Sequence, residues 1–293
     1  MKEKTIRPRI ATKDATRHIL KRFNLHASKR FGQNFLIDYG IAREIAASIA
    51  AAPGDLVLEI GPGIGSLTQA ILETGADVVA VEVDKKLPAV LAETLAGYDN
   101  FRLVEGDVLK LDLNEVMGGK KFKVAANLPY YITTPIIMGL LEQRLPVTAI
   151  SCMVQKEVGL RLVAEPSTKD YGALTIASNF YTNPRLVLEV PPKAFLPAPA
   201  VDSVVVAFDV LEQPKVEVAS EKLFFRIVKA AFGQRRKTIL NALRSGGFAD
   251  EEIKAAFTAA GLDLGRRGET FSLSEFASLT NALSEILTPA AKL

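Results

Sequence analysis

The chain has 293 residues, of which 48% are hydrophobic and 24% are charged, and its formal net charge is +3. This length predicts one large domain with a smaller one, and no apolar run approaches the roughly 20 residues of a membrane-spanning helix, which excludes an integral membrane protein. With one cysteine, Cys152, the chain has no disulfide framework. The two histidines, His18 and His26, both lie within the first 30 residues, which excludes a histidine-dependent catalytic triad or a multi-histidine metal site in the rest of the chain. No bound metal is therefore expected.

The first part of the chain, residues 1–30, is a basic segment. It contains ten lysines or arginines and two acids, a local balance of +8, so the remainder of the chain is net acidic. Ile19, Leu20 and Phe23 recur at helical spacing, which predicts a basic arm with one amphipathic helix. Serine is scarce, no small-residue cleavage signal follows, and no secretory apolar region is present, so we expect neither a transit peptide nor a signal peptide, and a cytoplasmic protein.

From residue 54 onward, short β-branched runs alternate with helical stretches, which is typical of a parallel sheet covered by helices. The expected strands are 56–60, 77–83, 101–104, 123–126 and 147–153. Helices are expected at 66–73 and from 84 to about 96. Two later runs, 187–190 and 203–208, are expected to close the sheet as an antiparallel pair. These elements predict an α/β domain over residues 31–212.

After residue 212 the pattern changes to helical periodicity. The segments concerned are 220–232, 235–244, 250–260 and 273–286. They predict a small all-helical domain over residues 213–293. Within it, the stretch 223–244 carries six basic residues and no acid. Basic segments on either side of an acidic body indicate a polyanionic partner, because lysine and arginine gain affinity by displacing counterions from phosphates. A solvated basic face remains the alternative.

A glycine-rich turn, Glu59-Ile60-Gly61-Pro62-Gly63-Ile64-Gly65, lies between the first strand and the first helix. Glycines allow a sharp turn and a close approach of a ligand, and the following helix N-terminus favours an anionic group. Glu82 ends the next strand, where a carboxylate can accept hydrogen bonds from two ribose hydroxyls. Asp107 follows the third strand, as an acceptor near an adenine or as a turn residue. This pattern fits any ligand with a ribose, including NAD.

The sequence Asn127-Leu128-Pro129-Tyr130 follows the fourth strand, at the edge of the sheet where the ligand is expected. Its composition suits methylation of adenine N6. The Asn127 side-chain oxygen and the Leu128 carbonyl could accept the two N6 protons and direct the nitrogen lone pair toward a methyl sulfonium. Such a reaction depends on positioning and electrostatics and needs no histidine base. Tyr130 offers one aromatic face for the base, and Phe195 could offer the other or could be a core residue.

At this point four motifs resemble the ribosomal RNA adenine dimethylases, and most closely their bacterial small-subunit (16S) members. The motifs are Phe31-Gly32-Gln33-Asn34-Phe35-Leu36, the glycine-rich turn, 127–130 and 231–238. The resemblance runs from about residue 12 to the end of the chain. It implies a class I, Rossmann-like methyltransferase fold with a mostly parallel seven-stranded sheet, S-adenosylmethionine as methyl donor, and dimethylation of two adjacent adenines in a hairpin loop near the 3′ end of 16S rRNA, in the 30S particle.

The resemblance also assigns residues. Cofactor-binding positions carried over are Asn34, Leu36, Gly61, Gly63, Glu82, Asp107 and Asn127. It places Asn127 in the methyl-transfer region, where the chemistry of the residues themselves leads us to expect Leu128, Pro129, Tyr130 and Phe195 as well. The helical domain, through Arg235, Arg236 and Lys237, and the arm, through Lys29 and Arg30, are expected to contact rRNA.

Three alternatives remain open on the sequence. One is a large-subunit (23S) rRNA adenine methylase of the macrolide-resistance type, and another is a non-catalytic RNA-binding or ribosome-assembly factor. The third is an NAD-dependent dehydrogenase, for which no hydride-transfer acid or base is evident. A substrate as large as a ribosomal subunit makes a monomer the simpler expectation.

Overall fold

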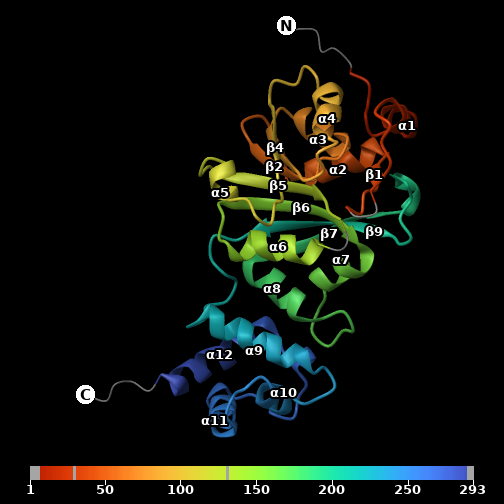
Figure 1. Cartoon of the computed structure of the whole chain (residues 1–293). Helices are drawn as coiled ribbons and strands as arrows, with labels where there is room; N and C mark the ends of the chain where they lie inside the picture. Colours follow the sequence, from red (N-terminus) through yellow and green to blue (C-terminus); the bar gives the residue numbers. More distant parts are fainter. Residues whose placement is uncertain (1–6, 29–30, 130–131, 289–293) are drawn as a thin grey trace. The chain divides into compact units, whose positions relative to one another are not determined.

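The computed structural model describes residues 7–28, 31–129 and 132–288 (Figure 1). None of the helices in these ranges is long and apolar enough to cross a membrane. The chain divides into two compact units. Unit 1 contains Met1–Gly159 and Pro184–Val210, and unit 2 contains Leu160–Asn183 and Leu211–Leu293.

Unit 1 is built on a seven-stranded sheet with the strand order β4-β3-β2-β5-β6-β9-β7. The strands are β2 (Leu56–Ile60), β3 (Asp77–Glu82), β4 (Phe101–Glu105), β5 (Phe122–Asn127), β6 (Val147–Gln155), β7 (Thr182–Val190) and β9 (Ser203–Val210). Pairs from β4 to β6 are parallel, and β9 is antiparallel to β6. Strands β2 and β3 are buried on both faces, which explains their continuous apolar runs. The predicted Rossmann-like, mostly parallel sheet is confirmed.

Helices cover both faces of this sheet. Figure 1 shows α2 (Tyr39–Ser48), α3 (Ser66–Leu72) and α4 (Pro88–Thr94) on one side and α6 (Thr133–Glu142) on the other. The short helix α5 (Leu113–Val116) precedes β5, and α7 (Lys156–Leu162) follows β6. Helix α4 begins four residues later than predicted, with a proline in its first turn, where the missing N–H costs no hydrogen bond.

The order of the strands reverses between β2 and β5. The chain runs from β2 outward through β3 to β4, then returns to the other side of β2 at β5. At such a switch point the loops after the two strands diverge and leave a crevice at the carboxyl edge of the sheet. The glycine-rich turn follows β2 and Asn127 ends β5, so the fold itself opens a site between the two motifs.

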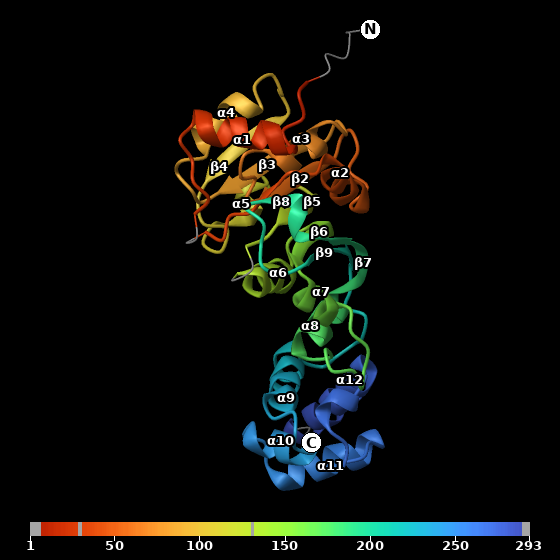
Figure 2. The same cartoon turned by 90° about the vertical axis from the view of Figure 1, so that its right-hand side faces the viewer.

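The N-terminal arm is attached to unit 1 through helix α1 (Lys13–Arg22) and the segment before it (Figure 2). The buried side chain of Gln69, on α3, accepts from the Ile10 N–H at 2.8 Å and donates to the Pro8 carbonyl at 3.0 Å. Thr12 caps α1 and forms a bridge with Asp38. The predicted amphipathic helix is present, with its apolar side chains packed against the core of unit 1.

A second, two-stranded sheet joins distant parts of unit 1. Strand β1 (Phe35–Leu36) pairs antiparallel with β8 (Phe195–Leu196), which follows the short helix η1 (Pro192–Ala194). The side chains of Phe35, Leu36 and Phe195 are all buried in the main core cluster. This pairing fixes the segment after the basic arm against the core.

Unit 2 is helical, but its boundary differs from the predicted one at residue 213. It contains α8 (Ala173–Tyr181), α9 (Glu221–Gly233), α10 (Ile239–Ser245), α11 (Asp250–Ala260), η2 (Gly268–Thr270) and α12 (Leu273–Leu287). Residues 160–183 join it because aromatic side chains of α8 pack on α9: the ring centroids of Phe180 and Phe224 are 4.8 Å apart. Such long-range packing leaves no local signal in the sequence.

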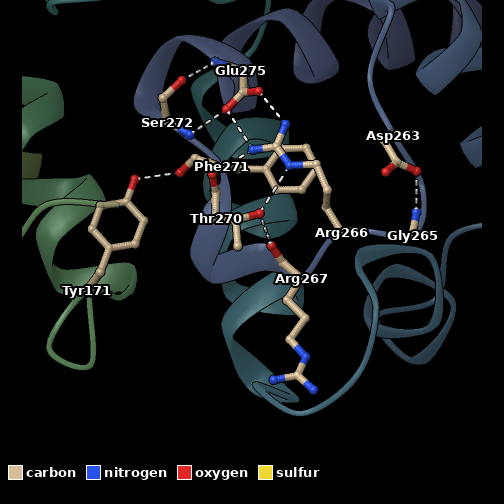
Figure 3. A network of polar contacts seen from close by, with 9 residues as sticks. All are labelled: Tyr171, Asp263, Gly265, Arg266, Arg267, Thr270, Phe271, Ser272 and Glu275. Atoms are coloured by element: carbon tan, nitrogen blue, oxygen red, sulfur yellow. Dashed lines mark hydrogen bonds and ion pairs between the residues drawn. The ribbon is translucent and has the colours of Figure 1, made fainter. Parts of the chain in front are cut away.

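A polar network stabilises unit 2 around the start of α12 (Figure 3). Arg266 donates to both carboxylate oxygens of Glu275 and to Thr270, and its guanidinium lies 4.1 Å from the centre of the Phe271 ring. The Tyr171 hydroxyl donates to the Phe271 carbonyl at 2.7 Å. The segment 160–183 is therefore tied to the C-terminal helices by hydrogen bonds as well as by aromatic packing.

Candidate cofactor and substrate site

One cavity of unit 1 lies at the carboxyl edge of the sheet, at the switch point described above. The cofactor-binding residues assigned from the sequence all line it: Asn34, Leu36, Gly61, Gly63, Glu82, Asp107 and Asn127. They come from the segment around β1 and from the ends of β2, β3, β4 and β5. Leu128 and Pro129 line the same cavity. The structure thus brings together residues that span nearly a hundred positions of the chain.

The glycine-rich turn lets a ligand approach the backbone. Gly61, Gly63 and Gly65 have φ values of 70°, 60° and 95°, in the left-handed region that side chains rarely adopt. A Cβ at Gly61 would meet no atom within 4 Å, so the space beside it is open. Gly65 is the N-cap of α3, whose first N–H groups point toward this turn.

Glu82 is oriented by the backbone around it. One carboxylate oxygen accepts from the N–H groups of Val83 and Asp84 at 2.9 and 2.8 Å, and the other accepts from the Gly63 N–H at 3.3 Å. Burial raises the pKa of Glu82, although these N–H groups oppose the shift. The carboxylate is therefore held in place at the end of β3, linked to the glycine-rich turn, and lines the cavity.

Glu59 is a second buried acid of this site, and no role for it was expected from the sequence. Burial raises its pKa to about 8. Its Oε2 and the Ser66 Oγ are buried without a hydrogen-bond partner among the described residues, and both residues line the cavity. Unpaired buried polar atoms are costly, so a ligand with amino or hydroxyl groups would satisfy groups that the protein leaves unpaired. A nucleoside with an amino acid moiety, such as S-adenosylmethionine, fits this set.

Asn127 is oriented by the segment before β1. Its Nδ2 donates to the Asn34 carbonyl at 3.2 Å. Because the amide nitrogen is used in this way, the Oδ1 atom is left as an acceptor, and within the described residues it accepts no hydrogen bond. Asn34 in turn donates from its own side chain to the Gly32 carbonyl at 3.2 Å. Asn34 therefore acts on the site through its backbone, which residue spacing could not reveal.

The backbone after Asn127 is anchored on both sides. The Leu128 N–H donates to the Met153 carbonyl of β6 at 3.1 Å, and the Pro129 carbonyl accepts from the Thr133 hydroxyl at 3.1 Å. The Leu128 side chain is buried. Tyr130, assigned as an aromatic face for the base, lies outside the described residues. This anchoring gives Asn127, Leu128 and Pro129 a fixed position at the rim of the cavity.

Asp107, Val83 and Gln33 also line the cavity. The Asp107 carboxylate accepts from the Leu109 N–H at 3.1 Å, so it has the turn role considered as an alternative while also lining the cavity. Val83, 47% exposed, lines it as well, and Gln33 bridges the Ser28 N–H and the Asp84 carboxylate at 2.9 Å each. Val83 could have been found from its place directly after Glu82.

Phe195 does not line the cavity. Its side chain is 3% exposed and belongs to the core cluster, beside Leu36 in the β1–β8 pair. Of the two interpretations that the sequence allows for Phe195, the structure shows the core residue. Stacking of Phe195 on the target base stays a prediction and would require the ring to leave the core.

The basic residues assigned to rRNA are in different situations. Lys29 and Arg30 lie outside the described residues. A helix was predicted for residues 235–244, and this prediction is wrong at its start: Arg235 to Lys237 form a turn. Thr238 pairs with Arg267, and α10 begins only after it. Arg235 donates to the Lys169 carbonyl at 2.7 Å and lies 3.6 Å from the Glu269 carboxylate. Arg236 and Lys237 are exposed, so they remain available to a ligand.

Comparisons with known proteins identify the family of this chain. The sequence pattern of the family described as ribosomal RNA adenine dimethylase matches residues 24–285. A relative from Alkaliphilus oremlandii (strain OhILAs), named ribosomal RNA small subunit methyltransferase A, is 47% identical over 285 residues, covering 95% of this chain and 99% of the relative. One of the same name from Moorella thermoacetica is 48% identical over 283 residues, covering 94% and 98%.

Solved structures show the same fold. The crystal structure of the 23S rRNA methyltransferase ErmE has a TM-score of 0.68 and 26% identity, covering 86% of this chain and 100% of that one. The family match spans both units and includes every motif quoted from the sequence. The chain therefore belongs to the ribosomal RNA adenine dimethylase family, an enzyme family of rRNA methyltransferases.

Proposed function

We propose that this protein uses S-adenosylmethionine to dimethylate N6 of two adjacent adenines in a hairpin loop near the 3′ end of 16S rRNA, in the context of the 30S particle in the cytoplasm. The observation that carries the proposal is the orientation of Asn127. Its amide nitrogen is bound to the Asn34 carbonyl, which leaves Oδ1 as an acceptor at the rim of a cavity lined by Glu82 and Asp107. The small-subunit rRNA is proposed because relatives at 47–48% identity are named for that subunit.

Each residue of the cavity would bind a different part of the cofactor or of the target base. Glu82 would hold the ribose hydroxyls, Asp107 the adenine amine, and the turn at Gly61 the methionine end, where Glu59 and Ser66 have unpaired polar atoms. When bound, S-adenosylmethionine supplies a methyl group on a positively charged sulfur. The Asn127 Oδ1 and the Leu128 carbonyl would bind the two protons of the target amine, so that its lone pair faces the cavity. The gain in rate comes from this positioning, because none of these groups is required to act as a base.

The proposal is tested by incubating the protein with isotopically labelled S-adenosylmethionine and either undermethylated small subunits or undermethylated large subunits, followed by mass spectrometry of each rRNA. We expect label on two adjacent adenines near the 3′ end of 16S rRNA. Labelled large-subunit rRNA would indicate the 23S type of enzyme instead, and no label on any rRNA would indicate a non-catalytic assembly factor. Either result would refute the proposal.

Asn127→Ala is the matching variant. Removing its amide removes one of the two acceptors for the amine, so methyl transfer should fall at least 100-fold while RNA binding stays within about twofold of the unaltered protein. Asn114→Ala is a suitable control, since Asn114 is exposed on α5 and does not line the cavity. Methyl transfer by Asn127→Ala at a rate near that of the unaltered protein would show that Asn127 has another role.

A further inference from the structure

Helix α1 carries two kinds of basic residue. Arg22 of α1 forms an ion pair with Glu93 of α4 at 2.8 Å. In the segment before the helix, the guanidinium groups of Arg7 and Arg9 lie 4.0 and 4.4 Å from the centres of the Tyr98 and Tyr39 rings. These three arginines are used inside the protein and fasten the arm to unit 1.

Lys13, Arg17 and Lys21 are different. All three are exposed, and none has a partner among the described residues. They are four residues apart, so they lie along one face of α1, about 6 Å from one to the next at a rise of 1.5 Å per residue. The one acid of the helix, Asp14, lies in the first turn, where it interacts favourably with the helix dipole.

This face is held rigidly toward solvent. Ile19 and Leu20 of α1 and Phe23 at its C-cap pack against the core of unit 1, and Thr16 is completely buried. The helix therefore cannot turn its charged face inward without exposing this apolar surface. The family match begins at residue 24, so α1 lies before the part of the chain that the family pattern matches.

We propose that Lys13, Arg17 and Lys21 form a basic stripe that binds the phosphodiester backbone of the rRNA substrate, outside the cavity that receives the target base. The inference rests on the proposed function, because it takes the rRNA substrate as the polyanion. A row of cations on a fixed helix suits a repeating phosphate backbone, whereas a small anion would need one enclosed site with converging donors.

The test compares two double variants that lose the same charge from unit 1. Arg17→Gln with Lys21→Gln alters the stripe. Lys120→Gln with Lys121→Gln is the control, since these lysines are exposed immediately before β5, at the end of that strand away from the cavity. Binding to protein-free small-subunit rRNA and to assembled small subunits is measured over a range of KCl concentrations. The S-adenosylmethionine affinity and the melting temperature of each variant check that the fold is intact.

For the stripe variant we expect the slope of log Kd against log salt to fall by about 1.4–1.8, which corresponds to about 0.7–0.9 for each lost phosphate contact. The control should keep the slope of the unaltered protein. Equal slopes in both variants would refute binding of the rRNA backbone by the stripe. Weaker binding of the stripe variant to assembled subunits, with unchanged binding to protein-free rRNA, would also refute it and would indicate a protein partner. An unaltered protein that methylates no rRNA would instead refute the proposed function and leave the binding comparison intact.

Discussion

Replacing Glu82 by glutamine tests the cofactor pocket most directly. In the structure the carboxylate accepts three backbone N–H groups, two of them at one oxygen. Glutamine has one acceptor oxygen, and keeping it opposite Val83 and Asp84 turns the NH₂ group toward the Gly63 N–H and the cavity. A ligand hydroxyl would then lose a charge-assisted hydrogen bond, worth about 1.5–3 kcal/mol. At about 1.4 kcal/mol per tenfold, this predicts roughly 10- to 150-fold weaker binding of S-adenosylmethionine.

The assay is isothermal titration calorimetry of each variant with S-adenosylmethionine, with Glu105→Gln as the matched control. Glu105 is paired in register with Glu82 on the neighbouring strand, but it is exposed and does not line the cavity. Because burial raises the pKa of Glu82, its neutral replacement should not lower the melting temperature of the ligand-free protein by more than a few degrees. Binding of Glu82→Gln within threefold of the unaltered protein, or an equal loss in Glu105→Gln, would refute the assigned role.

Three further predictions concern pH, the glycine-rich turn and unit 2. The pKa of Glu59 is raised from 4.5 to about 8, so between these pH values the folded protein keeps a proton that the unfolded chain releases. The free energy of unfolding of the ligand-free protein should therefore fall as the pH rises from about 4.5 to about 8. Glu59→Gln should make this fall smaller, as measured by urea unfolding at about pH 5 to 9. Gly65→Ala should destabilise the protein by about 1–2 kcal/mol, because φ is 95° and a Cβ would lie 3.2 Å from Leu95; an unchanged melting temperature would contradict this. Arg235→Gln should cost about 1 kcal/mol of stability, because it loses the hydrogen bond to the Lys169 carbonyl within unit 2. Lys237→Gln should leave the melting temperature unchanged and reduce the salt dependence of RNA binding by about 0.7–0.9 in slope. If Lys237→Gln lowered stability and Arg235→Gln lowered the salt dependence instead, the roles given to the two residues would be wrong.

Much of unit 1 was predictable, because the sequence patterns that indicate its strands and its glycine-rich turn are local. The strand at 56–60 and the glycine-rich turn after it are adjacent in sequence, and Glu82 ends the next buried strand, so periodicity and spacing were enough to bring them to one edge of the sheet. The role of Asn34 was not predictable in this way. Its backbone carbonyl orients Asn127 across 93 positions, and that segment is held by long-range contacts, among them the pairing of β1 with β8 and the hydrogen bond from Gln33 to Asp84.

The basic residues illustrate the same division. From the sequence, Arg235 and Lys237 are equivalent members of one charged run, yet the structure uses Arg235 to hold the Lys169 carbonyl and leaves Lys237 exposed. On α1, likewise, Arg22 is paired with Glu93 while Arg17 is exposed without a partner among the described residues. Charge counting identifies a basic segment, but whether each charge is available depends on its neighbours in space.

The amino-acid sequence alone determined the fold class, the edge of the sheet at which the cavity lies and the family, because these depend on hydrophobic periodicity and on motifs a few residues long. Only the tertiary structure decided that residues 160–183 belong to the helical unit, that Phe195 lies in the core and that Glu59 has an unpaired buried oxygen. Each of these depends on contacts between segments far apart in the chain, where packing and desolvation, and not local conformational preference, set the outcome.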